Sequence, residues 1–541
     1  MRTCLRASAL LTAAALCGLA LAEFTGPAPL AWRWAQPTRV ASGGVPQIQG
    51  DRVYVAVGGR IYAVDRTTGN TLWRFPRGEA AEANFRNGCI LADGKVFAAA
   101  DDGSVYAVDA ATGNLAWQHL HPVAVTTNLV SAGANVFFGD TRSQIHGLNR
   151  ESGQPVSQAG VAVSEGLQTR LGSVEGAVLY STGRGSLVRL NPVTLRPDWT
   201  QRFQRLSNNG SFTVFGERIY VNSGSFVAAA RASNGAIIWQ RNVGRDLDLA
   251  PAAGPDGVAV VSRDGNLFTY NLQGNAVFPR GVKLDSAPIV PPVFVGRFVA
   301  VAGTNGALNL VNPTTGDLVW NYVLPPIVTR VTTPATGGGA GGGNTGEMGG
   351  AAGGPGVGSG AAGGGQAAGT PTVATFTQAG GSPVLAGDSL MLVTRDGSLL
   401  LFDRNLGVDL TAPTTRMVWP TPGQEVAGKA PMEIVFRLED VGIGVNPESI
   451  KIDINGQNYI GELSRDGFLS IRITSASTVN RPLQNGRAVI TVTASDWLGN
   501  TSVTKVNLSI DNTLNALGSP RRPDAAGAAG GGVMGGGGGR G

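Results

Sequence analysis

Short apolar or alternating segments recur along the first three quarters of the chain, with turn-forming residues between them. Residues 53–57 (VYVAV), 96–100 (VFAAA) and 218–222 (RIYVN) are typical of such segments. Asx-Gly pairs, such as Asp102-Gly103 and Asp264-Gly265, separate neighbouring segments and accept the positive φ that tight hairpins require. The pattern predicts an all-β protein built from small antiparallel sheets.

These segments belong to a repeat of about 40 residues. An Asp, Asn or Arg marks the same register in eight places: Asp65, Asp109, Asn149, Asn191, Arg231, Asn271, Asn312 and Asp403. A glycine follows four positions later in many repeats, and a tryptophan eight positions later in five. The clearest members of this repeat signature are Asp65, Gly69, Trp73, Asp109, Gly113, Trp117, Trp199, Gly235, Trp239, Gly316 and Trp320. Eight such sheets arranged radially predict an eight-bladed β-propeller.

The eighth repeat lacks its outer strand, because Thr411 stands where the tryptophan is due. Residues 30–34 (LAWRW) resemble the outer strand at 72–75 (LWRF). We therefore expect residues 30–35 to complete the last blade, with Trp32 in the tryptophan position. Such a closure joins the two ends of the ring and removes an exposed sheet edge.

The repeat pattern Ala-x-Asp-x-x-Thr-Gly-x-x-x-Trp, present at 63–73 and 107–117, resembles the repeat of pyrroloquinoline-quinone (PQQ)-type propellers. The resemblance covers roughly residues 30–410 and implies a quinoprotein-like propeller in which the tryptophan packs between blades. The compact repeats are similar to the propeller scaffold of outer-membrane protein assembly, the family of the β-barrel assembly lipoprotein. That family binds a partner protein through loops on one rim and needs no cofactor.

The remaining segments give the domain organisation. Residues 1–22 have the two arginines, apolar run and small residues of a Sec-type signal peptide, which predicts a periplasmic, envelope-associated or secreted protein. Residues 30–410 form the propeller, with a disordered glycine-rich insert at about 335–371. Residues 412–513 resemble a bacterial immunoglobulin-like β-sandwich, and 514–541 are expected to be a disordered glycine-rich tail.

Charge and cysteine content narrow the function classes. The net charge of +5 is too small in 541 residues for a nucleic-acid binder, and no segment after the leader is long and apolar enough to cross a membrane. Only Cys89 remains after the leader, so no internal disulfide forms, and we expect a buried, unreactive thiol.

Candidate chemistry is sparse. The resemblance also extends to PQQ- and calcium-dependent dehydrogenases. The alcohol dehydrogenases of that family carry a vicinal cysteine pair against the cofactor, which this chain lacks. His119 and His121 could bind a metal from one strand face, although no third ligand is evident, and an exposed outer-strand pair is the preferred interpretation. Asp101-Asp102 resembles half of a calcium loop but is better explained as a hairpin turn.

Two surface features leave alternatives open. Six arginines in loops of different blades form an anion-binding rim if they converge, and otherwise are scattered and solvated: Arg142, Arg170, Arg184, Arg205, Arg263 and Arg395. Trp497, in the 496–500 turn of the sandwich, is either an exposed platform or a packing residue.

The sequence thus predicts an exported, non-enzymatic propeller scaffold that binds protein partners in the cell envelope, as a monomer. No catalytic residue, metal site or cofactor is expected. The alternatives are a PQQ- and calcium-dependent quinoprotein oxidoreductase and a surface adhesin or carbohydrate-binding protein.

Overall fold

The computed structural model describes residues 24–517, apart from 25, 37, 39–42, 204–211, 279, 325–326, 331–371, 376 and 465–466. The predicted signal peptide and the whole predicted glycine-rich insert lie outside the described residues, and so does the predicted tail after residue 517. Within them, no helix has the length and hydropathy that crossing a bilayer requires.

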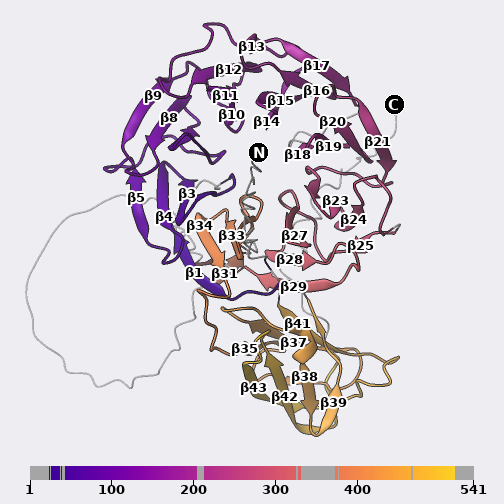
Figure 1. The fold of residues 1–541 in the computed structure, drawn as a ribbon. Helices are drawn as coiled ribbons and strands as arrows, with labels where there is room; N and C mark the ends of the chain where they lie inside the picture. The colour runs from indigo at the N-terminus through magenta and orange to yellow at the C-terminus, as the bar shows by residue number, and fades with distance from the viewer. Residues whose placement is uncertain are drawn as a thin grey trace, which may run out of the picture.

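Eight four-stranded antiparallel sheets form the blades of a propeller (Figure 1). Blade 1 contains β2 (Gln47–Gln49), β3 (Arg52–Val57), β4 (Arg60–Asp65) and β5 (Thr71–Phe75), and blade 2 contains β6 (Cys89–Ala92), β7 (Lys95–Ala99), β8 (Ser104–Asp109) and β9 (Leu115–Leu120). Blade 3 contains β10 (Val130–Ala132), β11 (Asn135–Gly139), β12 (Gln144–Asn149) and β13 (Val161–Ala162), and blade 4 contains β14 (Leu167–Val174), β15 (Ala177–Thr182), β16 (Ser186–Leu190) and β17 (Pro197–Arg202).

Blade 5 contains β18 (Phe212–Phe215), β19 (Arg218–Ser223), β20 (Phe226–Arg231) and β21 (Ile237–Asn242), and blade 6 contains β22 (Ala252–Gly254), β23 (Gly257–Val261), β24 (Asn266–Tyr270) and β25 (Val282–Lys283). Blade 7 contains β26 (Val293–Val295), β27 (Phe298–Ala302), β28 (Ala307–Val311) and β29 (Leu318–Val323), and blade 8 contains β32 (Val384–Ala386), β33 (Ser389–Val393), β34 (Ser398–Phe402) and β1 (Leu30–Ala35). The eight-bladed propeller is confirmed. A separate pair, β30 (Ile327–Arg330) and β31 (Thr372–Thr375), lies on either side of the glycine-rich insert.

The first strand of each blade lies near the centre of the ring and the fourth at its periphery (Figure 1). β1 pairs with β34 as the outer strand of blade 8, so the two ends of the propeller share one sheet. One apolar cluster joins Trp34, Val55 and Tyr62 to Met391 and Leu401, and thus fills the space between blades 8 and 1.

The repeat signature has a clear structural basis. The Asp65 carboxylate accepts hydrogen bonds from the backbone N–H groups of Thr67 and Thr68 and so fixes the turn between β4 and β5. At Gly113, φ is +72°, and a Cβ there would lie 2.6 Å from a ring carbon of Trp73 in the preceding blade. The Trp73 indole also donates to the Ala110 carbonyl at 3.0 Å. The glycine is therefore required both by its backbone conformation and by the indole that covers it.

The same donation from an outer-strand indole to the next blade occurs at five places: Trp32 to Arg66, Trp73 to Ala110, Trp117 to Arg150, Trp199 to Ala232 and Trp239 to Leu272. Trp239 packs on Gly274, which the sequence signature omitted because this turn is one residue shorter. Gly235 lies against Trp199, whereas Gly316 faces Val282 because blade 6 has no tryptophan in the register.

Two further sheets enclose one apolar core beyond the propeller. One contains β35 (Thr414–Trp419), β37 (Met432–Glu439), β41 (Phe468–Ile473) and β40 (Glu462–Leu463); the other contains β36 (Glu425–Val426), β43 (Thr501–Ile510), β42 (Gly486–Ser495), β38 (Lys451–Ile454) and β39 (Gln457–Tyr459), with a 3-10 turn at Pro447–Ser449. The domain lies outside the ring beside β29 and β1 (Figure 1). Its immunoglobulin-like assignment stays a prediction.

Candidate functional site

Two regions of the described structure combine polar chemistry with an open pocket. The first is a histidine–aspartate cluster between blades 2 and 3, and the second is the junction between the propeller and the sandwich.

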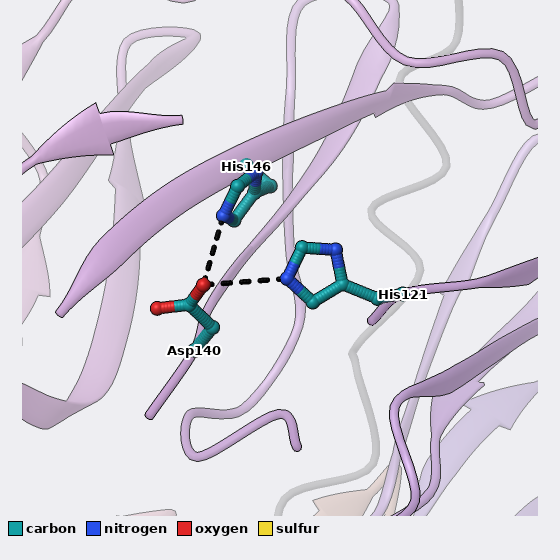
Figure 2. Close-up of side chains that lie close together, drawn as sticks. All are labelled: His121, Asp140 and His146. Carbon is teal, nitrogen blue, oxygen red and sulfur yellow. Dashed lines mark hydrogen bonds and ion pairs between the residues drawn. The ribbon is translucent and has the colours of Figure 1, made fainter. Parts of the chain in front are cut away.

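His121, Asp140 and His146 form the histidine–aspartate cluster (Figure 2). His121 directly follows the outer strand β9 of blade 2, Asp140 follows β11, and His146 lies within β12. Both Nε2 atoms lie beside the same Asp140 oxygen, Oδ2, at 3.3 Å for His121 and 3.1 Å for His146. His121 and Asp140 are buried, and His146 is nearly so.

The protein surroundings favour a charged Asp140 carboxylate and a neutral His121 imidazole. Burial lowers the pKa of His121, although its hydrogen bond to Asp140 opposes this effect. Burial alone would raise the pKa of Asp140, but hydrogen bonds from backbone N–H groups and from both imidazoles outweigh it, and the pKa is lowered. Burial also lowers the pKa of His119.

The sequence identified one of the cluster's residues and missed two. The preferred interpretation of His119 and His121 as an exposed pair is wrong for His121, which is only 7 % exposed. His146 and Asp140 complete the cluster, but they lie about 20 residues away and only the β11–β12 hairpin brings them to His121. The signal that could have found them is that Asp140 occupies a turn position where the other repeats have small or hydroxyl residues.

The remaining predicted residues lie as follows. Asp101 and Asp102 belong to the β7–β8 turn, where Asp102 accepts from the Ser104 N–H at 2.8 Å. Cys89 is buried, and burial raises the pKa of its thiol to about 12. Both observations agree with the structural roles expected for these residues.

Four of the arginines share one rim, because they lie in equivalent turns between the second and third strands of their blades: Arg142, Arg184, Arg263 and Arg395. Carboxylates occupy the same rim, and Arg263 is paired with Asp248 at 2.9 Å. Arg170 lies on the inner strand β14, and Arg205 lies outside the described residues. This rim is of mixed charge.

At the junction between the propeller and the sandwich, one tryptophan of the repeat register has a hydrogen-bond acceptor in the sandwich and not in the next blade. Trp320 of blade 7 is fully buried, but its indole donates to the Ile443 carbonyl of the sandwich at 2.9 Å. The Tyr322 hydroxyl donates to the Val441 carbonyl at 3.3 Å. The sandwich loop therefore takes the place that the following blade has elsewhere.

Further contacts tie this loop to the end of the propeller. The Asp409 carboxylate accepts from the Ile443 N–H at 2.8 Å, and the Asn500 side chain donates to the Asp409 carbonyl at 3.0 Å. Trp497 packs against the apolar cluster of blades 7 and 8, which favours a packing role over an exposed platform. A pocket of about 230 Å³ lies between Asn321 and Val323 of β29 and residues 437–445 of the sandwich.

Solved structures with similar folds include the crystal structure of BamB from Moraxella catarrhalis, with 16 % identity, a TM-score of 0.49, and coverage of 69 % of this chain and 97 % of that one. The computationally designed Ika8 protein matches with 13 % identity, a TM-score of 0.50, and coverage of 68 % and 98 %. A europium-containing methanol dehydrogenase matches with 14 % identity, a TM-score of 0.44, and coverage of 55 % and 82 %. At these identities the likeness concerns the fold alone.

No curated protein matches the chain. The family model described as outer membrane protein assembly factor BamB matches residues 29–189, 143–277 and 183–409, which together span the whole propeller and most of the chain. The chain therefore belongs to the family of outer membrane protein assembly factor BamB.

Proposed function

We propose that this protein is an interaction scaffold of the cell envelope, which binds a protein partner at the junction between propeller and sandwich. The family supports an envelope role, because it takes its name from an outer-membrane assembly factor. The observation that carries the proposal is a group of exposed aliphatic side chains at the junction.

Val408, Leu410 and Val441 are 78 %, 82 % and 70 % exposed. They are three of the four most exposed large apolar side chains among the described residues. The segments that carry them lie against each other, because Asp409 accepts from the Ile443 N–H. Exposed apolar side chains that gather in one place, rather than singly, are typical of protein interaction sites.

The surroundings of this group suit a protein contact. Val441 also lines the junction pocket, which contains Arg437 and Glu439 beside apolar Leu438 and Leu463. An apolar centre with a charged edge is the usual composition of an interface. The hydrogen bonds of Trp320 and Tyr322 hold the loop in place, so the surface is formed before a partner binds.

The test compares two variants in the envelope fraction of the source cells. Leu410→Lys combined with Val441→Lys places two charges in the group, and Val193→Lys changes an equally exposed valine, 80 % exposed, in a turn of blade 4. After chemical cross-linking, affinity purification and quantitative mass spectrometry, we expect the first variant to lose a defined protein partner by about tenfold or more, as burying an unpaired charge predicts. Equal recovery of every co-purified protein with both variants and the wild type would refute the proposal.

A further inference from the structure

We propose that His121, Asp140 and His146 bind one divalent transition-metal ion of the zinc type, at the boundary between blades 2 and 3. The proposal concerns a site separate from the junction and does not depend on the scaffold function.

The distribution of histidine in the chain is the first observation. The whole sequence contains three histidines in 541 residues, and all three line one pocket of about 260 Å³. The ring centroids of His121 and His146 are 4.3 Å apart, and those of His119 and His121 are 6.4 Å apart. Histidine is thus rare in this chain, and every histidine lies at this one site.

The ligand atoms have the spacing of a coordination shell. Asp140 Oδ2 lies 3.3 Å and 3.1 Å from the two Nε2 atoms, and one ligand atom of each residue lies within 4.8 Å of the others. Tetrahedral Zn²⁺, with bonds of 2.0–2.1 Å, places its ligand atoms roughly 3.3 Å apart. Small shifts of these side chains therefore suffice to admit an ion among the three atoms that point toward one another in Figure 2.

The Asp140 carboxylate is held in place by the backbone. Its Oδ1 accepts from the N–H groups of Arg142 and Gln144, each at 2.9 Å, while Oδ2 faces the imidazoles. Hydrogen bonds of this kind orient a ligating carboxylate and are a usual component of metal sites. Arg142 also lines the pocket, but its side chain is exposed, so water screens its charge.

Comparison with the other blades shows that the cluster is particular to this place. The backbone position of His121 is held elsewhere by Val163, Phe203, Val243, Leu284 and Leu324. The position of Asp140 is held by Ala100, Ser262, Gly303 and Thr394, and that of His146, the third residue of its strand, by Tyr62, Tyr106, Val188 and Phe268. None of these equivalents is a histidine or a carboxylate, so the fold does not require these residue types at the three positions, and their joint presence calls for another role.

The donor set indicates the kind of ion. Two imidazole nitrogens and one carboxylate suit Zn²⁺ and its neighbours, whereas Ca²⁺ and Mg²⁺ prefer six or more oxygen ligands. Three protein ligands leave one coordination position, which faces the solvent-connected pocket. Because His121 belongs to blade 2 and the other two ligands to blade 3, the ion would also link neighbouring blades.

The test measures metal binding by the full chain, purified with a tag that contains no histidine and stripped with a chelator. Zn²⁺ is titrated by calorimetry, and Co²⁺ by its visible absorption, which becomes intense in four-coordinate sites. The ligand variants His121→Leu and His146→Phe introduce residue types found at the same positions in other blades, so their folding is protected. Asp140→Asn keeps the oxygen that holds the turn, and His119→Ala is the matched control on the same pocket.

We expect one ion per chain, a four-coordinate Co²⁺ spectrum and no competition by excess Ca²⁺. Each ligand variant should weaken Zn²⁺ binding by about 100-fold or more, and His119→Ala by less than about threefold. Absence of saturable one-to-one binding, or unchanged binding in His121→Leu and His146→Phe, would overturn the site. An equal loss in His119→Ala would overturn the three-residue ligand set.

Discussion

Trp32 lies directly on Gly69, although the two residues belong to the last and the first blades of the ring. A Cβ on Gly69 would lie 2.8 Å from the indole, and the indole nitrogen donates to the Arg66 carbonyl at 2.9 Å. The contact has the same form as that between Trp73 and Gly113. The N-terminal strand thus closes the propeller with the contact that joins its other blades.

The indole–glycine contact predicts a specific stability difference between two glycines with the same backbone conformation. Gly113 has φ +72° and is covered by Trp73, whereas Gly94 has φ +70° and open space within 4 Å of the place where a Cβ would lie. Gly94→Ala should cost about 1–2 kcal/mol of unfolding free energy from backbone strain alone. Gly113→Ala should cost a further 1–3 kcal/mol or so, because the new methyl group displaces the indole.

Urea unfolding followed by tryptophan fluorescence measures both values. Equal losses in Gly113→Ala and Gly94→Ala would contradict the view that the indole, and not only the turn, selects glycine.

The junction should weaken as the pH rises from about 4 through 6. Burial raises the pKa of Asp440 to about 6, with the nearby Asp409 and Asp496 carboxylates adding to the effect and the Gly444 N–H opposing it. The unfolded carboxyl has a pKa near 3.9. Between these two pKa values the folded state binds more protons than the unfolded state. The stabilising contribution of protonated Asp440 is therefore complete below about pH 4 and is lost as the pH rises through 6.

Asp440→Asn removes this titration and should raise the melting temperature at pH 7.5 by about 2–4 °C, with a much smaller effect at pH 4.5. Differential scanning calorimetry of both proteins at the two pH values measures the difference. The expected control is Asp453→Asn, a carboxylate in the β38–β39 hairpin of the sandwich, which should not change this pH dependence. A variant that is less stable than the wild type at pH 7.5 would refute the explanation.

A structural feature could be predicted from the sequence where the residues that form it recur in several of the repeats. The Asp, Gly and Trp register predicts the eight blades and the ring closure by Trp32, because each contact recurs every 40 residues or so. The histidine–aspartate cluster was not predictable in this way, since Asp140 and His146 occur in one blade only and meet His121 through a neighbouring sheet. The unusual partner of Trp320 was hidden for the same reason: Ile443 is 123 residues away, in another domain.

The quinoprotein alternative makes a direct prediction about cofactor binding. Beyond residue 22 the only cysteine of the sequence is Cys89, whose buried thiol donates to the Tyr54 carbonyl, so it has no vicinal cysteine to lie against a quinone. We therefore expect PQQ with calcium to cause no saturable quenching of tryptophan fluorescence and no dye-linked alcohol oxidation. Saturable quenching at micromolar PQQ together with dye reduction would establish an oxidoreductase instead.

The most direct test of the scaffold proposal is site-specific photo-cross-linking in the living source cells. A benzophenone amino acid is placed at Leu410, in the exposed apolar group of the junction, or at Val193, an equally exposed position in blade 4. The scaffold proposal predicts a discrete cross-linked partner from position 410 that position 193 does not give, and that Val441→Lys abolishes. The same products from both positions, or none from position 410 while the protein is present and folded, would contradict it.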